Sequence, residues 1–261
     1  MSYPDRKLRR MLTTMVGAAL ALGVAGTAAA QSIVVRSTGP SATKYPAGTK
    51  LKPTEKITLV DGDKVVVLDK GKTRTFAGKG SYAATGPVQG TQTVSSTVTR
   101  MISKQGSARS RGGFTRGPGD PVPAPGDARS PNLWVVDIRH GGTFCVADPA
   151  TLLFWRPDMT SDALLTLETG SGAAAKSQSL AYVSGANYVK WPRDAVPFAT
   201  GADYRVSGVG LPAPVTLRFA SVDAMPETVE ATVDLLLAKG CKAQLDLLVD
   251  TLADEAARPA A

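Results

Sequence analysis

Few side chains in this 261-residue sequence are suited to acid–base, metal or nucleophilic chemistry. The chain contains one histidine, His140, and two cysteines, Cys145 and Cys241. General acid–base catalysis and zinc sites depend heavily on His and Cys, and His140 stands beside two glycines that indicate a solvated turn between strands. The sequence has neither a G-x-S-x-G elbow nor a phosphate-binding P-loop. We therefore predict no catalytic residue, no metal site and no cofactor.

Two pairs of carboxylates are the remaining candidates for chemistry. Asp61 and Asp63 flank a glycine in a turn, but two carboxylates alone offer too few oxygens to hold Ca²⁺. Asp158 and Asp162 follow a predicted strand and could supply the acid and the base of a hydrolase. A secreted hydrolase that uses this second pair is kept as an alternative hypothesis.

The first thirty residues have the three parts of a secretory signal peptide. Residues 6–10 are basic, a stretch of about fifteen residues rich in Ala, Leu and Val follows, and small residues stand at Ala28 and Ala30. The apolar run is short and rich in Ala and Gly for a bilayer of about 30 Å, which favours cleavage over a retained membrane helix. We expect cleavage between Ala30 and Gln31, export to the periplasm or beyond, and no membrane anchor afterwards.

The even number of cysteines in an exported chain predicts one disulfide, between Cys145 and Cys241. Such a bridge would close a loop of about 96 residues, and the entropy that it removes from the unfolded chain would stabilise the fold by about 4.5 kcal/mol. It would fasten the C-terminal segment to the sheet that contains Cys145. Two buried free thiols are the alternative.

The formal net charge of +8 is the sum of unlike regions. Residues 1–30 carry +3, residues 31–131 carry +10, and residues 132–261 carry −5. Export argues against DNA or RNA as the partner, so we expect the basic front to bind an acidic envelope protein or glycan. A weaker alternative is an extracellular polyanion binder, and its candidate contacts are Arg109, Arg111 and Arg116.

The predicted fold is mainly β, with two small antiparallel β domains and a C-terminal helical hairpin. In the front half, Ile57–Val60 and Val65–Leu68 are expected to form a hairpin around Asp61-Gly62-Asp63, as part of a small meander. Thr91–Gln105 fits both helical and alternating spacing, and we favour a helix. Residues 103–131 contain 6 Gly and 5 Pro, which predicts a mobile linker.

The back half has the regular short strands of an antiparallel sandwich of immunoglobulin-like or fibronectin-like type. Its aromatic residues are expected to form the core, and a carbohydrate platform of exposed Trp is the alternative. Eight strands are expected to begin near Leu133, Thr143, Leu152, Ala163, Leu180, Tyr188, Asp203 and Val215.

The C-terminal region has the spacing of two amphipathic helices that meet at Lys239-Gly240. Pro226-Glu227 suits the start of the first helix, and we expect both helices to pack on the sandwich. The predicted apolar faces are formed by Val229, Val233, Leu236 and Leu237 in the first helix and by Leu245, Leu248, Val249 and Leu252 in the second.

The front half resembles the FecR-type periplasmic β-domain. The resemblance rests on the runs Tyr45–Leu51, Lys56–Leu59, Asp61–Asp63, Val65–Leu68 and Gly78–Tyr82, which give a Gly-led start, a strand, a Gly-Asp turn and a Gly-rich return. Residues 113–117 are similar to the Val-Arg-Gly element with which such domains close. FecR proteins relay a signal from the outer membrane to a sigma factor through a cytoplasmic tail and one membrane span. Here a predicted signal peptide stands in the place of the tail and the span.

The resemblance implies an envelope interaction module of the FecR fold. With Leu133-Trp134, Phe154–Pro157 and Gly240-Cys241, the back half is similar to companion domains of proteobacterial envelope proteins of no known activity. The predicted function is therefore that of a non-enzymatic, exported binding or signalling-scaffold protein. The predicted domains are a signal peptide (1–30), a FecR-like β domain (31–116), a linker (117–131), a β-sandwich (132–222) and a helical hairpin (223–256).

Overall fold

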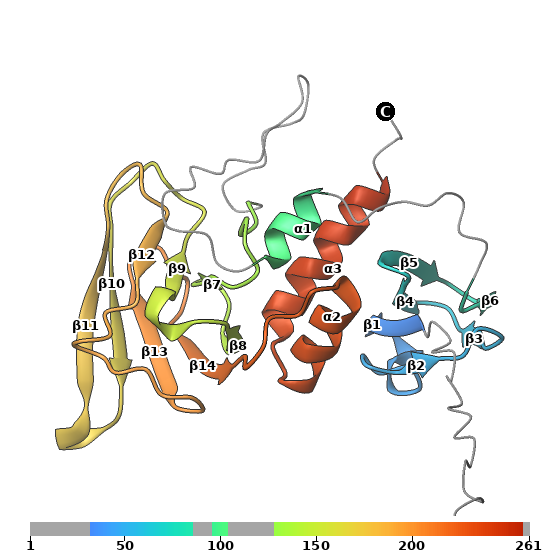
Figure 1. Cartoon of the computed structure of the whole chain (residues 1–261), viewed down its shortest axis with the longest axis horizontal. Coiled ribbons are helices and arrows are strands. Elements are labelled where there is room, and N and C mark those ends of the chain that lie inside the picture. Colours follow the sequence, from blue (N-terminus) through green and yellow to red (C-terminus); the bar gives the residue numbers. More distant parts are fainter. Residues whose placement is uncertain (1–31, 86–95, 104–127, 258–261) are drawn as a thin grey trace, which may run out of the picture.

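The computed structural model describes residues 32–85, 96–103 and 128–257 (Figure 1). The fold is mainly β, with several small sheets and a pair of C-terminal helices, as the sequence predicts. The helix pair lies in the middle of the molecule, with the sheets of β1–β6 on one side and those of β7–β14 on the other. Among the described helices, none has the length and hydropathy of a membrane span.

The front region consists of two small sheets packed face to face. Its strands are β1 (Ser32–Thr38), β2 (Lys50–Leu51), β3 (Lys56–Leu59), β4 (Lys64–Asp69), β5 (Lys72–Ala77) and β6 (Gly80–Ala83), with a short 3-10 helix at Pro40–Thr43. One sheet has the order β2-β1-β4-β5, and β3 pairs with β6 in the other. Val65 and Val67 of β4 point between these sheets, while Val66 and Leu68 point toward the helices. Both faces of β4 are therefore buried.

The predicted hairpin between Ile57–Val60 and Val65–Leu68 is wrong. β3 pairs with β6, whereas β4 pairs with β1 and β5, so the Asp-Gly turn forms a corner between two sheets. The buried Asp63 carboxylate fixes this corner, because it accepts hydrogen bonds from the Val60 and Ser41 backbone N–H groups at 2.7 Å each. The tight two-residue turn lies instead at Lys70-Gly71, where both φ angles are positive, as a type I′ hairpin requires.

The back region contains all eight expected strands. They are β7 (Val136–Asp137), β8 (Gly142–Val146), β9 (Leu153–Trp155), β10 (Ala163–Thr169), β11 (Lys176–Tyr182), β12 (Tyr188–Lys190), β13 (Asp203–Gly208) and β14 (Val215–Ser221), with 3-10 turns at Pro149–Thr151 and Gly172–Ala174. A five-stranded sheet with the order β11-β10-β13-β14-β8 packs on a three-stranded sheet with the order β12-β9-β7. Two pairings, β14 with β8 and β7 with β9, are parallel, so both sheets are mixed where antiparallel sheets were expected.

Aromatic residues fill the space between the two back sheets. Trp191 lies at their centre, with ring centroids 5.5 Å from Phe154, 4.9 Å from Tyr204 and 5.3 Å from Phe219. Its indole N–H donates to the Val196 carbonyl at 2.8 Å. All three tryptophans of the chain are at most 5% exposed, so the prediction of an aromatic core is confirmed and the alternative of an exposed Trp platform is wrong.

The helices form where the periodicity of the sequence places them. α1 (Ser96–Ile102) confirms the choice of helix for the ambiguous segment, and α2 (Val229–Ala238) and α3 (Lys242–Ala257) form the C-terminal pair. α2 begins slightly later than expected, with the Thr228 hydroxyl accepting from the Ala231 N–H as an N-cap. Gly240 ends α2 with a φ of 69°, which favours glycine.

One continuous hydrophobic core joins the helices to both β regions. It contains Ile33 and Leu68 from the front sheet, the buried side of α2 and α3, and Trp134 and Cys145 from the back region. α1 belongs to the same core, and the Trp134 indole N–H donates to the Ile102 carbonyl at 2.8 Å. The helix pair thus packs on both β regions, where packing on the sandwich alone was expected.

Candidate functional site

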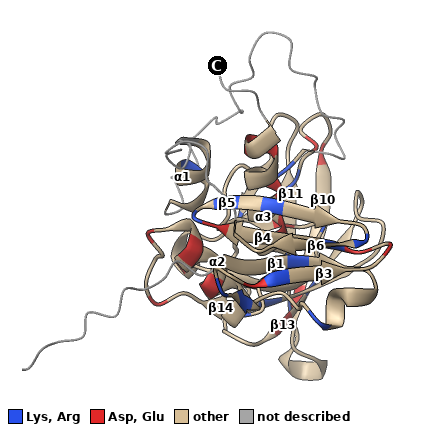
Figure 2. Cartoon of the chain, turned by 90° about the vertical axis from the view of Figure 1, so that its right-hand side faces the viewer, with Lys and Arg blue, Asp and Glu red and all other residues tan. Residues whose placement is uncertain are grey.

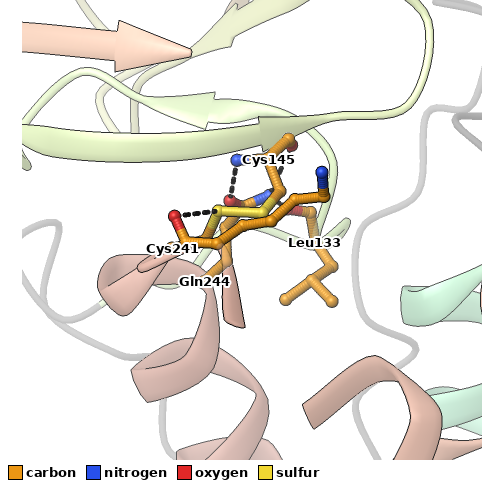
Figure 3. The surroundings of a disulfide bond; sticks show 5 residues. Leu133, Cys145, Cys241 and Gln244 are labelled. Atoms are coloured by element: carbon orange, nitrogen blue, oxygen red, sulfur yellow. Dashed lines mark hydrogen bonds between the residues drawn. A yellow bond between two sulfur atoms is a disulfide. The ribbon is translucent and has the colours of Figure 1, made fainter. Parts of the chain in front are cut away.

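The two cysteines meet at the junction of β8 with the helix pair (Figure 3). Cys145 and Cys241 form a disulfide with a Cα–Cα distance of 5.7 Å, between the two residues for which the sequence predicts a bridge. Both residues are at most 1% exposed. The bridge ties the start of α3 to the back sheet, which is the mechanical role expected from the sequence.

Gln244 completes this junction, although no motif in the sequence points to it. Its side-chain amide accepts from the Cys145 N–H at 2.6 Å and donates to the Cys145 carbonyl at 3.0 Å and the Leu133 carbonyl at 2.7 Å. The amide therefore takes the place of a neighbouring strand along the open edge of β8 (Figure 3). Because Gln244 is only 2% exposed, each of these hydrogen bonds is shielded from water.

A cleft of about 420 Å³ lies next to the junction, between α3 and the segment that leads into β8. Its walls combine apolar side chains such as Phe144 with the charged groups of Asp137, Arg139 and His140. On the opposite wall α3 contributes Asp246 and Asp250. A volume of this size could hold a small organic ligand, so the cleft is the first place to look for chemistry.

The charged groups on the sheet side of the cleft are held by one another. Arg139 donates through Nε and Nη2 to the two oxygens of the Asp137 carboxylate at 3.0 and 2.7 Å, and Nη2 also reaches the Ala128 carbonyl at 2.8 Å. The single histidine, His140, is 57% exposed, and its Nε2 lies 3.7 Å from the same carboxylate. Asp137 therefore orders this turn, and the structure places His140 in the exposed loop that the sequence indicates.

The carboxylates on the helix side of the cleft accept hydrogen bonds from an arginine of the front sheet. Arg36 of β1 donates to the Asp250 carboxylate at 2.7 Å and to the Asp246 carboxylate at 3.0 and 3.2 Å. Burial alone would lower the pKa of Arg36, but hydrogen bonds and charge from Asp250 and then Asp246 raise it above its ordinary value. The Arg36 guanidinium therefore stays charged, and the cleft presents few groups that are not already engaged.

Asp246 and Asp250 belong to an acidic stripe along α3 that ends at Asp254. Asp254 accepts from Arg129 at 2.5 Å, and on α2 Asp234 lies 3.7 Å from Lys50. The spacing of four residues between successive acids places them on one face of the helix, and this spacing is a signal in the sequence that could have found them. The structure thus pairs part of the basic front with the chain's own acidic helices.

The carboxylates of the hydrolase hypothesis are both engaged in hydrogen bonds to loops, Asp158 to its own loop and Asp162 to the loop that follows β11. The Ser161 hydroxyl, the Thr160 N–H and the Thr160 hydroxyl donate to Asp158, and these bonds lower the pKa of Asp158 to about 2. Asp162 accepts from the Ser184 N–H at 2.7 Å. A carboxylate with so low a pKa is a poor proton donor or acceptor near neutral pH. The geometry gives the hydrolase hypothesis no support, and it stays a prediction.

The buried carboxylate at the front turn, Asp63, has a structural role as well. Burial tends to raise the pKa of Asp63, but hydrogen bonds from Ser41 and Val60 lower it below its ordinary value. Within the described residues there is no group of three or more His, Cys, Asp or Glu side chains that could hold a metal ion. Asp63 therefore works as a backbone acceptor that shapes the corner between the front sheets.

The exposed charge of the front sheets is almost entirely positive. Asp63 and Asp69 are buried, Glu55 is partly buried, and Asp61 is the one exposed carboxylate among residues 32–85. Figure 2 shows basic residues on β1, β3 and β5 in the view onto this region. Seven lysines are exposed here: Lys44, Lys50, Lys52, Lys56, Lys64, Lys70 and Lys79.

Several predicted site residues lie outside the described part of the chain. They are the cleavage residues Ala30 and Gln31 and the candidate polyanion contacts Arg109, Arg111 and Arg116. In comparisons with known proteins, no protein-family model, curated protein or solved structure matches the chain. Any function must therefore be inferred from the chain's own residues.

Proposed function

We propose that this chain is a non-enzymatic, exported protein of the cell envelope, periplasmic or secreted, that binds or scaffolds an anionic envelope partner. The basic surface of the front sheets makes the contact, and the partner is an acidic protein or a glycan. In this proposal the front sheets are an interaction module of the FecR type. The helix pair and the back sheets hold that module in place through the shared core.

The observation that carries this proposal is the contrast between seven exposed lysines and one exposed carboxylate in residues 32–85. Within the described residues, Lys50 is the only one of the seven with an ion pair, to Asp234 of α2. The other six face solvent, and a surface with one sign of charge attracts polyanions through long-range electrostatics. Lys64 and Lys79 lie at neighbouring turns, because the Gly78 N–H donates to the Asp63 carbonyl at 3.0 Å.

A matched pair of charge-reversal variants tests where an anion binds. In the mature chain, residues 31–261, the front variant carries Lys56→Glu, Lys64→Glu and Lys79→Glu. The back variant carries the same change at three exposed positions: Lys190→Glu, Arg193→Glu and Arg205→Glu. Both variants have the same net charge, so a difference between them reports position alone.

The readout is the NaCl concentration that elutes each protein from immobilised heparin, used as an anionic glycan, and from immobilised polyglutamate, used as an acidic polypeptide. The wild type is expected to be retained and to elute with salt, and the front variant to elute well before the back variant. Equal elution of the two variants would contradict the proposal. Stronger retention on one of the two matrices would choose between glycan and protein.

Export is tested separately. N-terminal sequencing of the protein from a periplasmic or culture fraction is expected to begin at Gln31. An unprocessed chain that stays with the cytoplasm would remove the envelope part of the proposal and leave the anion-binding part standing.

A further inference from the structure

The open edges of the sheets differ in length and in protection. β2, β7 and β12 have two or three residues and β3 and β6 have four. The six-residue edge strand β5 carries Lys72 and Arg74, and the edge of β8 is capped by the Gln244 amide. β11 is the longest edge strand in the described part of the chain, with seven residues in unbroken register with β10. Within those described residues, no strand pairs with its other side, and Figure 1 shows β11 at the outer margin of the molecule.

β11 lacks the features that usually keep an edge strand from pairing with another chain. It contains no proline and no bulge, and its single charged residue, Lys176, stands at its first position. Ser177, Ser179 and Ala181 are exposed along it. Soluble proteins normally protect a long edge with charges, prolines, bulges or a covering segment, so an unprotected edge indicates a pairing surface.

We propose that β11 pairs with β11 of a second copy of this chain, antiparallel and centred on Ser179, so that the two five-stranded sheets join into one. This is a two-fold, self-complementary contact of the kind that forms most homodimers. In this register Ser179 faces its own copy, and Ser177 faces Ala181. The inference does not depend on the proposed anion-binding function.

The charges at the two ends of β11 are complementary in this arrangement. Lys176 at one end faces Tyr182 at the other end of the second copy's strand. The acidic loop of Asp158 and Asp162 lies at that far end, because Asp162 accepts from the N–H of Ser184, two residues beyond Tyr182. The Arg156 guanidinium also lies at this end, 4.7 Å from the centroid of the Tyr182 ring, but Arg156 is only 5% exposed. Arg156, Asp158 and Asp162 together leave this end with one net negative charge, so each copy offers a cation where the other is acidic, and the contact occurs twice.

Like charges are kept apart by the same register. The two Lys176 positions are separated by six residues along the joined strands, or about 20 Å at about 3.3 Å per residue. This distance is well beyond the screening length of about 8 Å at physiological ionic strength. Continuing the register by one place brings Val183, which is 61% exposed, opposite the exposed Ala175. An exposed apolar side chain thus gains an apolar neighbour at each end of the interface.

A single introduced cysteine tests both the interface and its register. Paired Cα atoms across antiparallel strands lie about 4.5–5.5 Å apart, a distance that a disulfide spans, so Ser179→Cys should cross-link to its own copy. Ser177→Cys is the matched control on the same strand, because its copy would lie about 13 Å away. Both natural cysteines are held in the Cys145–Cys241 bridge, so no natural thiol competes.

The measurements are sedimentation equilibrium of residues 31–261 and non-reducing electrophoresis after mild oxidation. We expect twice the chain mass for the wild type, a covalent dimer for Ser179→Cys and none for Ser177→Cys. A wild type that is monomeric at every concentration would overturn the proposal. So would equal cross-linking of the two variants, or a dimer in which neither cross-links, because β11 would then not be the interface.

A charge variant checks the complementary ends. Lys176→Glu places a carboxylate opposite the acidic loop at both ends of the interface. The change is expected to raise the dissociation constant of the dimer roughly threefold to tenfold, with the circular dichroism spectrum unchanged. Lys190→Glu on β12 makes the same charge change at an exposed position outside the strand and should leave the constant unaltered. Equal effects of the two changes would contradict the register.

Discussion

The two β regions of this protein are attached to the same helices by different chemistry. The back region is joined by the Cys145–Cys241 bridge and by the buried hydrogen bonds of Gln244. The front region is joined by apolar packing of β1 and β4 against the helices. At the margin of this contact, Arg36 and Lys50 form ion pairs with carboxylates of the helices. A covalent bond and shielded hydrogen bonds are insensitive to salt, whereas half-exposed ion pairs are screened. The front attachment should therefore respond to ionic conditions and the back attachment should not.

The largest effect is expected from removing the covalent attachment. Cys145→Ala combined with Cys241→Ala should lower the free energy of unfolding by about 4 kcal/mol, because the bridge closes a long loop in the unfolded chain. Urea unfolding followed by circular dichroism measures this loss, and the loss should be the same at low and high salt. A loss below about 1 kcal/mol would mean that the bridge constrains the unfolded chain little.

The next effect is expected at the amide that caps β8. Gln244→Ala leaves one N–H and two carbonyls without their partner in a buried site and should lower the free energy of unfolding by about 2–3 kcal/mol. Gln178→Ala on the edge strand β11 is the matched control, since among the residues that the structure describes that amide bonds only the Ser179 carbonyl, at 3.3 Å. Equal stability of the two variants in urea unfolding would show that the cap contributes nothing.

The smallest effect is expected at the ionic attachment of the front. Arg36→Met keeps the apolar stem and removes the guanidinium, which should cost about 1 kcal/mol at low salt and much less at about 0.5 M NaCl. Lys50→Met, at the longer and more exposed pair with Asp234, should cost only a few tenths of a kcal/mol. Urea unfolding at both salt concentrations gives the comparison. A cost for Arg36→Met that does not change with salt would contradict the contrast between the two attachments.

The local sequence pattern predicted much of the secondary structure. It did not predict which strands pair when they are distant in the sequence. The strands of the back half and the face of Leu245, Leu248 and Leu252 follow from alternation and helical spacing, which depend on neighbouring residues. The hairpin around Gly62 is wrong because an Asp-Gly turn is compatible with either a hairpin or a corner. Asp63 accepts from Val60 within the turn and also from Ser41, more than twenty residues away along the chain, and this distant contact favours the corner.

The charge pattern of the sequence indicates a basic front half and an acidic back half, but it does not indicate which of these charges form ion pairs within the chain. The sequence shows a basic front, an acidic back and acids spaced by four residues along the last helix. Arg36 could bind a partner molecule or the acids of its own chain, and the packing of β1 against α3 decides between them. This packing brings Arg36 to Asp246 and Asp250, which lie 210 and 214 positions further along the chain. Charge spacing alone carries no information on that distance.

The sequence by itself determined the β-rich class, the two terminal helices, the cysteine pair and the uneven distribution of charge, because composition and local periodicity set these features. Only the tertiary structure decided that the helices lie between two β regions, that Gln244 caps an edge strand and that β11 is left open. These outcomes depend on which apolar faces and which strand edges contact each other. The hydrophobic effect is non-directional, so an apolar face favours burial without specifying the surface that buries it.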